Sequence, residues 1–278
     1  MGRASAVFSF LAVISAGVRF FRSLFGHAIF HVKSASLLTF LSVNGIIYSV
    51  IKDWALLPIL RSFMETKLIL IRHGESLGNA TRTYLGHTDL DLSDKGREQA
   101  QCAADYFKDT KIEAIYSSDL KRAFNTAVPH GKYHNLEVIG TRELLEVNVG
   151  EWEGKKIEYI IEHWPQEFCI DWRQIFGVST PPGGEPVVDA AKRMYNKLLS
   201  IARAHKGVVL VTAHAAIIRA FWCYAQGIEP KKWGESYPFP TNASASFVGF
   251  DGEKLVPLKF SFDEYISNEY RGQPSTSL

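Results

Sequence analysis

Cysteine is scarce in this sequence. Only Cys102, Cys169 and Cys223 occur among 278 residues, and they are odd in number and widely spaced. A disulfide framework needs paired cysteines at close spacings, so the small disulfide-stabilised class is excluded. No spacing of cysteine and histidine has the form of a zinc site, and we expect neither a metal ion nor a cofactor. The pattern is typical of reduced, buried thiols in a cytoplasmic protein.

The chain also lacks a strong charge of either sign. Its formal net charge is +2 at pH 7, which gives no reason to expect a nucleic-acid partner. Acidic residues are nearly absent from residues 1–63. This segment contains six lysines and arginines but only one acidic residue, Asp53, so its net charge is +5. The first 63 residues therefore differ in character from the rest of the chain.

Residues 1–63 form a hydrophobic, basic N-terminal extension with two uncharged stretches, at 4–18 and 34–51. The first stretch has the form of a signal-peptide core, and the second is barely long enough to span a bilayer. A third interpretation is that translation starts at Met64, just before the first strand, and a fourth is an ordered helical extension. A membrane is expected as a partner only if residues 1–63 are translated and act as an anchor. A chain starting at Met64 is expected to be soluble and active.

The sequence Leu-Ile-Leu-Ile-Arg-His-Gly-Glu-Ser occupies residues 68–76. Its short apolar run predicts a buried parallel strand, because it is too unpatterned for an amphipathic helix. Ligands of open α/β sheets bind just beyond the carboxyl ends of the strands, so Arg72 and His73 are expected in the binding site. A guanidinium binds phosphate oxygens in a bidentate fork, and a neutral imidazole can attack phosphorus.

Two further strands deliver polar residues in the same way. The run at 207–213 predicts a buried strand that places His214 at its carboxyl end, before a helix at 215–226. The run at 112–118 predicts another strand, followed by a helical segment at 119–127 with Arg122 in its first turn. A helix N-terminus beside the site favours bound anions. Lys121 is expected to be solvated.

The other predicted elements complete an alternation of strands and helices. Amphipathic spacing and capping residues predict helices at 94–108 and 187–205, and shorter helices at 155–164 and 165–176. A short strand is predicted at 136–139. Two late strands at 242–250 and 255–260 are joined by a hairpin at Asp251-Gly252.

These motifs resemble the histidine phosphatase superfamily, the fold shared by phosphoglycerate mutases and many phosphomonoesterases. The resemblance covers about residues 67–251 and rests on Arg72-His73-Gly74-Glu75 and on the Ser-Ser-x-Leu-x-Arg-Ala-x-x-Thr-Ala pattern at 117–127. It implies an α/β fold, a three-layer α/β/α sandwich whose mostly parallel central sheet has an antiparallel edge strand. The domain would span residues 64–262, and residues 263–278 would form a polar tail.

The resemblance also implies roles for individual residues. His73 would be the nucleophile, Arg72 and Arg122 would hold the phosphate, and His214 would donate a hydrogen bond to the transferring phosphoryl group. Glu146 would be the general acid, because it alone among neighbouring carboxylates fits the pattern of Glu, three residues and then Gly-x-x-Glu/Gln-Gly. This role requires a pKa raised by partial burial, which we predict for Glu146.

Three more residues are implied to bind the substrate: Asn79, Gly86 and Ala215. Ala215 departs from the family, which usually has glycine after this histidine. His87 matches no family position and is expected to be an exposed loop residue, and His205 is expected to be a helix-terminus residue. The aromatic residues of the 152–176 region could either form an apolar substrate wall or pack in the core; they are Trp152, Trp164, Phe168, Trp172 and Phe176.

The reaction that these residues predict is hydrolysis of a small phosphorylated metabolite through a phosphohistidine. The first alternative is phosphoryl transfer of the phosphoglycerate mutase type. Mutases carry Arg and Tyr where this chain has Val147 and Val149, and basic residues where it has Ile157 and a lone Arg173. The second alternative is an inactive binding protein of the same fold, which would be expected to lack His73 or Glu146.

Overall fold

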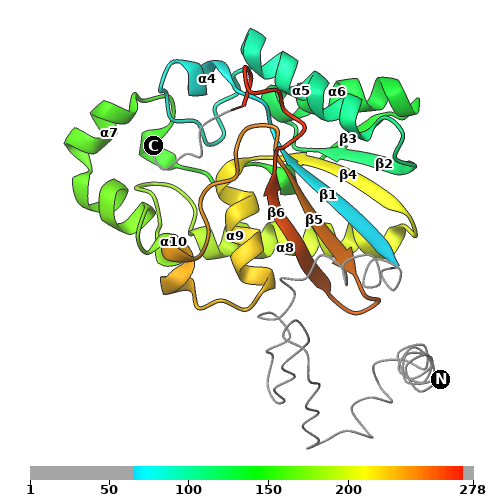
Figure 1. Cartoon of the computed structure of the whole chain (residues 1–278). Coiled ribbons are helices and arrows are strands. Elements are labelled where there is room, and N and C mark those ends of the chain that lie inside the picture. The colour runs from blue at the N-terminus through cyan, green and yellow to red at the C-terminus, as the bar shows by residue number, and fades with distance from the viewer. Residues whose placement is uncertain (1–64, 272–278) are drawn as a thin grey trace, which may run out of the picture. The chain divides into compact units, whose positions relative to one another are not determined.

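The computed structural model describes residues 65–271, apart from the side chains of Ile170 and Asp171 (Figure 1). The expectations for residues 1–63 and for a start at Met64 lie outside the described residues. Within residues 65–271, no helix combines the length and the apolar composition that a membrane crossing would need.

The described residues form one sheet of six strands, in the order β3-β2-β4-β1-β5-β6. Its four strands from β3 to β1 run parallel, β5 is antiparallel to β1, and β6 is antiparallel to β5. The prediction of a mostly parallel sheet with an antiparallel edge is therefore confirmed. The strands are β1 (Thr66–Arg72), β2 (Ile112–Ser117), β3 (Val138–Gly140), β4 (Val208–Ala213), β5 (Ala245–Phe250) and β6 (Leu255–Phe262).

Helices cover both faces of this sheet, with α5 and α6 on one face and α8 and α9 on the other (Figure 1). Short helical turns lie at Arg142–Leu144, Gly150–Trp152, Phe176–Val178 and Pro230–Lys232, and a π-helical segment lies at Gln166–Trp172. The α-helices are α4 (Leu77–Ala80), α5 (Asp94–Phe107), α6 (Lys121–His134), α7 (Ile157–His163), α8 (Val187–Ala204), α9 (Ala215–Ala225) and α10 (Trp233–Ser236).

The alternation of side chains along β1 explains the three layers. Leu68 and Leu70 join the core cluster under α8 and α9, whereas Ile69 and Ile71 join the cluster under α5 and α6. Successive strand residues point to opposite faces, so a strand with helices on both sides must be apolar throughout. The continuous apolar run at the start of the motif is therefore a consequence of the layered fold.

Helix α6 differs from the predicted segment at both ends. It begins at Lys121, after Leu120 in an extended conformation, so Asp119 lies before the helix and no acidic residue occupies its first turn. Instead, the side chain of Asp89 accepts a hydrogen bond from the Lys121 amide at 2.8 Å. The helix then continues through Pro129 to His134. Its N-terminus is thus capped by a residue from a distant loop, which local sequence does not indicate.

The region predicted as a helix at 165–176 is a π-helical segment followed by a short helical turn. Phe168 and Trp172 lie four positions apart in this segment and contact the same neighbours. Both rings make edge contacts with Tyr84 and Trp152, at centroid distances of 5.2–6.2 Å. Both rings are buried, at 0% and 2% exposure.

Two other expectations need correction. Residues 263–271, assigned from the sequence to a polar tail, pack against α5: Ile266 is 1% exposed and Tyr265 stacks on Tyr106 with ring centroids 4.8 Å apart. Of the three cysteines expected to be buried, only Cys223 is buried, while the other two are half-buried; all three are free thiols.

Candidate active site

The carboxyl ends of three neighbouring parallel strands, β2, β4 and β1, meet at one edge of the sheet. In the register of the ladder Arg72 lies beside Ala213, and Ser117 lies beside Thr212. The residues that follow keep this pairing, because the His73 amide donates to Ala213 O at 2.9 Å and the Ser118 amide to Thr212 O at 3.0 Å. His73, His214 and Ser118 therefore emerge side by side.

The two histidine rings are in contact. Their centroids are 5.2 Å apart, with an angle of 61° between the ring planes. Nδ1 of His73 lies 2.6 Å from the carbonyl oxygen of Gly74. A carbonyl can only accept, so Nδ1 carries the proton and Nε2 keeps its lone pair. Burial, reinforced by Arg122 and Arg72, holds the pKa of His73 well below its usual value. The imidazole is therefore neutral at pH 7.

Gly74, directly after the histidine, allows the loop to approach α5. A Cβ at this position would lie 2.3 Å from the carbonyl oxygen of Gly96, too close for any side chain. The Gly74 amide donates to the Thr126 hydroxyl of α6 at 3.1 Å. The loop that carries His73 is thus held between α5 and α6 by a contact that only glycine permits.

Two buried arginines lie beside the histidines. Arg72 donates through Nη1 to Pro240 O at 2.6 Å, and Arg122 donates to Thr88 O at 2.8 Å and Gly86 O at 2.7 Å. Burial lowers the pKa of Arg72 to about 10, so it remains cationic at pH 7. Neither guanidinium forms an ion pair with a carboxylate among the described residues.

Two buried nitrogen atoms in this group have no hydrogen-bond partner in residues 65–271: Nε of Arg72 and Nδ1 of His214. Nε2 of His214 lies 2.7 Å from the Ser118 hydroxyl, whose oxygen also accepts a long 3.4 Å bond from the Leu120 amide. We infer that Ser118 donates to Nε2, which leaves the proton on Nδ1. Orphaned buried donors are costly, so a cluster of cations and orphaned donors is suited to an anion such as phosphate.

Glu146 is buried, as its proposed role requires, with 7% of its surface exposed. Its carboxylate accepts from the amides of Val147 at 2.9 Å, Ala216 at 3.0 Å and Ile217 at 2.8 Å. Burial raises the pKa of Glu146, although these three amides and Arg122 act in the opposite direction. The last two amides belong to the first turn of α9, so the carboxylate sits at a helix N-terminus.

The residues predicted to bind the substrate lie close to this group. The Gly86 carbonyl accepts from Arg122, and Ala215 is the first residue of α9, next to the amide that holds Glu146. Asn79 uses its Oδ1 in the capping box of α4 and accepts there from Asn242 at 3.3 Å. Asn242 also donates to the His73 carbonyl at 3.1 Å, so it ties Asn79 to the loop that carries His73.

His87 is not the exposed loop residue that the sequence suggested. Its ring is half-buried, and Nε2 lies 2.9 Å from the backbone carbonyl oxygen of Glu146. The Glu153 carboxylate fixes this loop, because it accepts from the amides of Gly86 at 3.2 Å, His87 at 2.6 Å and Thr88 at 2.9 Å. The only local signal for this arrangement is the position of His87 directly after Gly86.

Most of the aromatic residues in the 152–176 region pack in the core rather than form a substrate wall. Four of them are fully buried, and Trp164 is partly buried. Tyr84, which contacts three of these rings, is half-buried, and its pKa is raised by burial and by the charge of Glu146. The buried members are Trp152, Phe168, Trp172 and Phe176.

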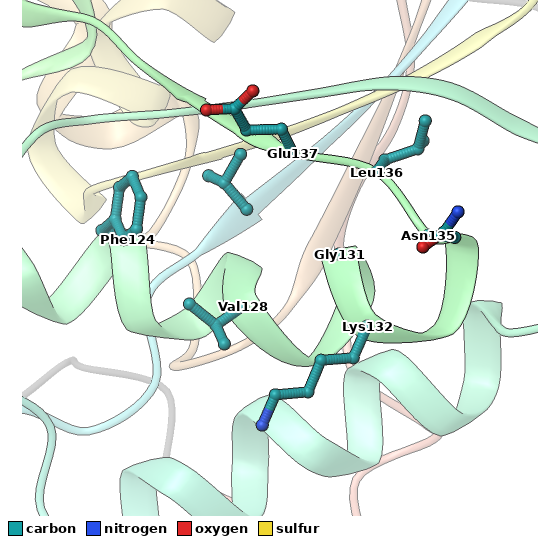
Figure 2. A pocket seen from close by; sticks show the side chains of 8 residues that line it. Phe124, Val128, Gly131, Lys132, Asn135, Leu136 and Glu137 are labelled. Carbon is teal, nitrogen blue, oxygen red and sulfur yellow. The ribbon is translucent and has the colours of Figure 1, made fainter.

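A separate hollow of about 450 Å³ lies between α6 and β3 (Figure 2). It shares no lining residue with the group around His73. Lys132 and Glu137 extend from its rim in different directions, so no set of charged donors converges there. We therefore place the candidate active site at the strand ends rather than in this hollow. Within the described residues, no three His, Cys, Asp or Glu side chains are grouped so that they could hold a metal ion.

An α/β protein with two histidines, two unpaired buried arginines and a buried glutamate at the carboxyl edge of its sheet has the form of a phosphate-handling enzyme. The sequence model of the histidine phosphatase superfamily (branch 1) matches residues 68–262, and the chain belongs to this family. The resemblance found in the sequence motifs is thereby confirmed.

Individual relatives support the same assignment. Phosphoserine phosphatase 1 of Hydrogenobacter thermophilus is 32% identical, over 73% of this chain and 96% of the relative. The 2,3-bisphosphoglycerate-dependent phosphoglycerate mutase of Bartonella henselae is 31% identical, over 61% of this chain and 85% of the mutase. Among solved structures, the mycobacterial glucosyl-3-phosphoglycerate phosphatase complexed with VO3 has a TM-score of 0.64 at 28% identity, over 70% of this chain and 98% of its own.

Proposed function

We propose that this chain hydrolyses phosphomonoesters of small metabolites through a phosphohistidine intermediate on His73. One observation carries the proposal: a neutral imidazole with a free Nε2 lies among Arg72, Arg122 and His214, and neither arginine has a carboxylate partner among the described residues. Buried cations that no carboxylate contacts directly favour a bound anion over an empty site. The relatives that are named phosphatases support the same class of reaction.

In the first step Nε2 of His73 attacks phosphorus with its lone pair. The bond between phosphorus and the ester oxygen breaks, and the protonated Glu146 carboxyl transfers its proton to the departing oxygen. Arg72, Arg122 and Nδ1–H of His214 stabilise the charge on the phosphoryl oxygens. The products are an alcohol and a phosphohistidine.

In the second step water attacks the phosphohistidine. The Glu146 carboxylate accepts a proton from this water, the bond between nitrogen and phosphorus breaks, and phosphate leaves. His73 returns to its neutral form, and Glu146 is again protonated. We propose that the fixed arginines supply the positive charge that a metal ion supplies in other phosphoryl-transfer enzymes.

A phosphoglycerate mutase is the second candidate, because a mutase is among the relatives. In the mutases, an arginine and a tyrosine lie one and three residues after the glutamate. Here those positions hold Val147 and Val149. Both valines are buried in the core, at 0% and 1% exposure. These side chains offer no donor to the carboxylate of a phosphoglycerate. The observation favours water over a second substrate oxygen as the phosphoryl acceptor.

The test is phosphate release by the full chain from a panel of esters that includes phosphoserine, 3-phosphoglycerate, sugar phosphates and nucleoside monophosphates. His73→Ala is expected to abolish turnover, and Glu146→Gln to reduce kcat about 10²- to 10⁴-fold. His163→Ala, a substitution of an exposed histidine on α7, is the matched control and is expected to retain full activity. Full activity of His73→Ala would refute the proposed nucleophile.

A further inference from the structure

The segment that carries Glu146 has little regular structure of its own. It follows the short helical turn at Arg142–Leu144, and the residues from 145 to 149 belong to neither helix nor strand. Their backbone carbonyls have no ladder to pair with, so they need other donors if they are to be buried. The position of the Glu146 side chain depends on whatever fixes this backbone.

One side chain from α8 supplies several of these donors. Arg193 donates through Nη1 to the carbonyl oxygens of Glu143 at 2.9 Å and Leu145 at 3.0 Å, and through Nη2 to that of Glu146 at 3.3 Å. Its guanidinium thus spans four residues of backbone. The planar fork of arginine suits this task, because it presents several donors in a fixed geometry.

Glu185 completes the clamp from the loop before α8. Its Oε1 accepts from Nη2 of Arg193 at 2.7 Å and from the Asn148 amide at 2.9 Å. The Glu185 amide in turn donates to the Asn148 carbonyl at 3.0 Å. The ion pair is half-buried, with both side chains 25% exposed. Glu185 therefore orients Arg193 and also binds the segment on the far side of Glu146.

The other side of the Glu146 peptide is held by His87. Its Nε2 and Nη2 of Arg193 approach the same carbonyl oxygen, which has two lone pairs and can accept both. The Glu146 carboxylate is meanwhile held by the first amides of α9. The backbone and the carboxylate of this residue are thus held by different elements, and the placement of the carboxyl depends on both.

We propose that Arg193 and Glu185 are positioning residues for the general acid: together they hold the Glu146 backbone so that its carboxyl reaches the ester oxygen of the substrate. The inference rests on the proposed function. Displacement of a reacting group by about 1 Å costs on the order of 100-fold in rate, so loss of the clamp is expected to reduce catalysis without any change in the phosphate ligands.

Leaving groups of different basicity test the clamp. An alkyl phosphate needs a proton from Glu146, whereas 4-nitrophenyl phosphate releases a stable phenolate and needs little help. Arg193→Lys keeps the charge but loses the fork. It is expected to lower kcat for the alkyl ester about 10- to 100-fold, with KM unchanged. For the nitrophenyl ester, kcat is expected to fall less than about threefold. Glu185→Gln is expected to show the same pattern more weakly.

Lys192→Ala is the matched control, because Lys192 is the neighbour of Arg193 on α8 and pairs with the exposed Asp189 at 3.4 Å. Glu146→Gln defines the pattern expected for loss of the acid. Equal losses on both esters, or no loss on either, would overturn the inference; if Arg193→Lys does not fold, Glu185→Gln decides by the same criterion. Failure of the unmodified chain to hydrolyse any ester would instead overturn the proposed function.

Discussion

At the scale of single residues, burial shifts the pKa values of the proposed nucleophile and of the proposed general acid in opposite directions. It lowers the pKa of His73, because the imidazolium is disfavoured, and raises the pKa of Glu146, because the carboxylate is disfavoured. Both shifts favour the neutral forms. A neutral imidazole and a protonated carboxyl are the forms that the first chemical step requires.

This predicts the pH dependence of turnover. Glu146 must be protonated to act as an acid, so kcat for an alkyl phosphate is expected to fall as pH rises through its raised pKa. His73 stays unprotonated down to well below pH 6.5, so it contributes no acidic limb near that pH. The measurement is kcat against pH at saturating substrate. Glu146→Gln is expected to remove the alkaline limb, and a limb that persists in this variant would contradict the assignment.

Ser118 provides a second test at this scale. Its hydroxyl lies 2.7 Å from Nε2 of His214, and we infer that it keeps the proton on Nδ1. Ser118→Ala is expected to lower kcat about tenfold, because His214 loses its preferred tautomer, with little change in KM. Ser117→Ala is the control: its hydroxyl bonds to Thr212 and to a backbone carbonyl rather than to His214. An equal loss of kcat in both variants would argue against the tautomer role.

The sequence could place the residues that follow strands but not those that support them. His73 and His214 each end an apolar run, so the strand pattern itself indicates where they lie. Arg193 gives no such signal, because its partners are backbone carbonyls 47 to 50 positions earlier in the chain. A contact with backbone requires no particular side chain at the partner position, so no residue pattern records it.

At the scale of elements, the apolar runs predicted the strands well. The helix boundaries, which were predicted from spacing and capping residues, were less accurate. β4 and the run at 207–213 nearly coincide, because a strand buried on both faces must be apolar throughout. The start of α6 was missed, because its cap comes from Asp89. The sheet order β3-β2-β4-β1 follows from long-range pairing, and the strands by themselves do not specify it.

The turn after Glu146 offers a test of an element rather than of a side chain. Gly150 has φ of +53°, and a Cβ there would lie 2.1 Å from the Pro182 carbonyl oxygen. An alanine in the left-handed conformation costs roughly 1–2 kcal/mol. Gly150→Ala is expected to destabilise the fold by more than this, because the loop at 181–184 must also move. Denaturant unfolding measures the change.

Gly154 is the matched control for this substitution. It has φ of +70°, but no atom of residues 65–271 lies within 4 Å of the position that a Cβ would take. Gly154→Ala should therefore show the conformational cost alone, about 1–2 kcal/mol. The difference between the two variants measures the close approach of the two loops. Equal losses of stability would mean that the loop at 181–184 adapts freely.

At the scale of the whole molecule, the last described segment is connected to the loop that follows His73 in the candidate active site. Gln99 of α5 donates to the Tyr270 carbonyl at 2.6 Å, and its Oε1 accepts from the Glu75 amide at 2.7 Å. Glu75 lies two residues after His73. The polar composition of residues 263–278 suggested a tail, because one buried isoleucine among polar residues gives no periodic pattern. Packing against α5 is a property of the assembled fold.

The last prediction concerns this docked segment. Ile266 is 1% exposed, so Ile266→Ala removes buried apolar volume and is expected to lower the free energy of unfolding by about 2–5 kcal/mol. Ile161→Ala is the control: this side chain on α7 is 37% exposed, and the change should be within about 0.5 kcal/mol. Denaturant melts of both variants give the comparison. If residues 263–271 separate from α5, Gln99 loses its contact with Tyr270 and holds the Glu75 amide less firmly. Hydrogen exchange of the Gly74 and Glu75 amides is therefore expected to accelerate in Ile266→Ala but not in Ile161→Ala. An unchanged free energy of unfolding in Ile266→Ala would show that residues 263–271 contact the domain without contributing to its stability.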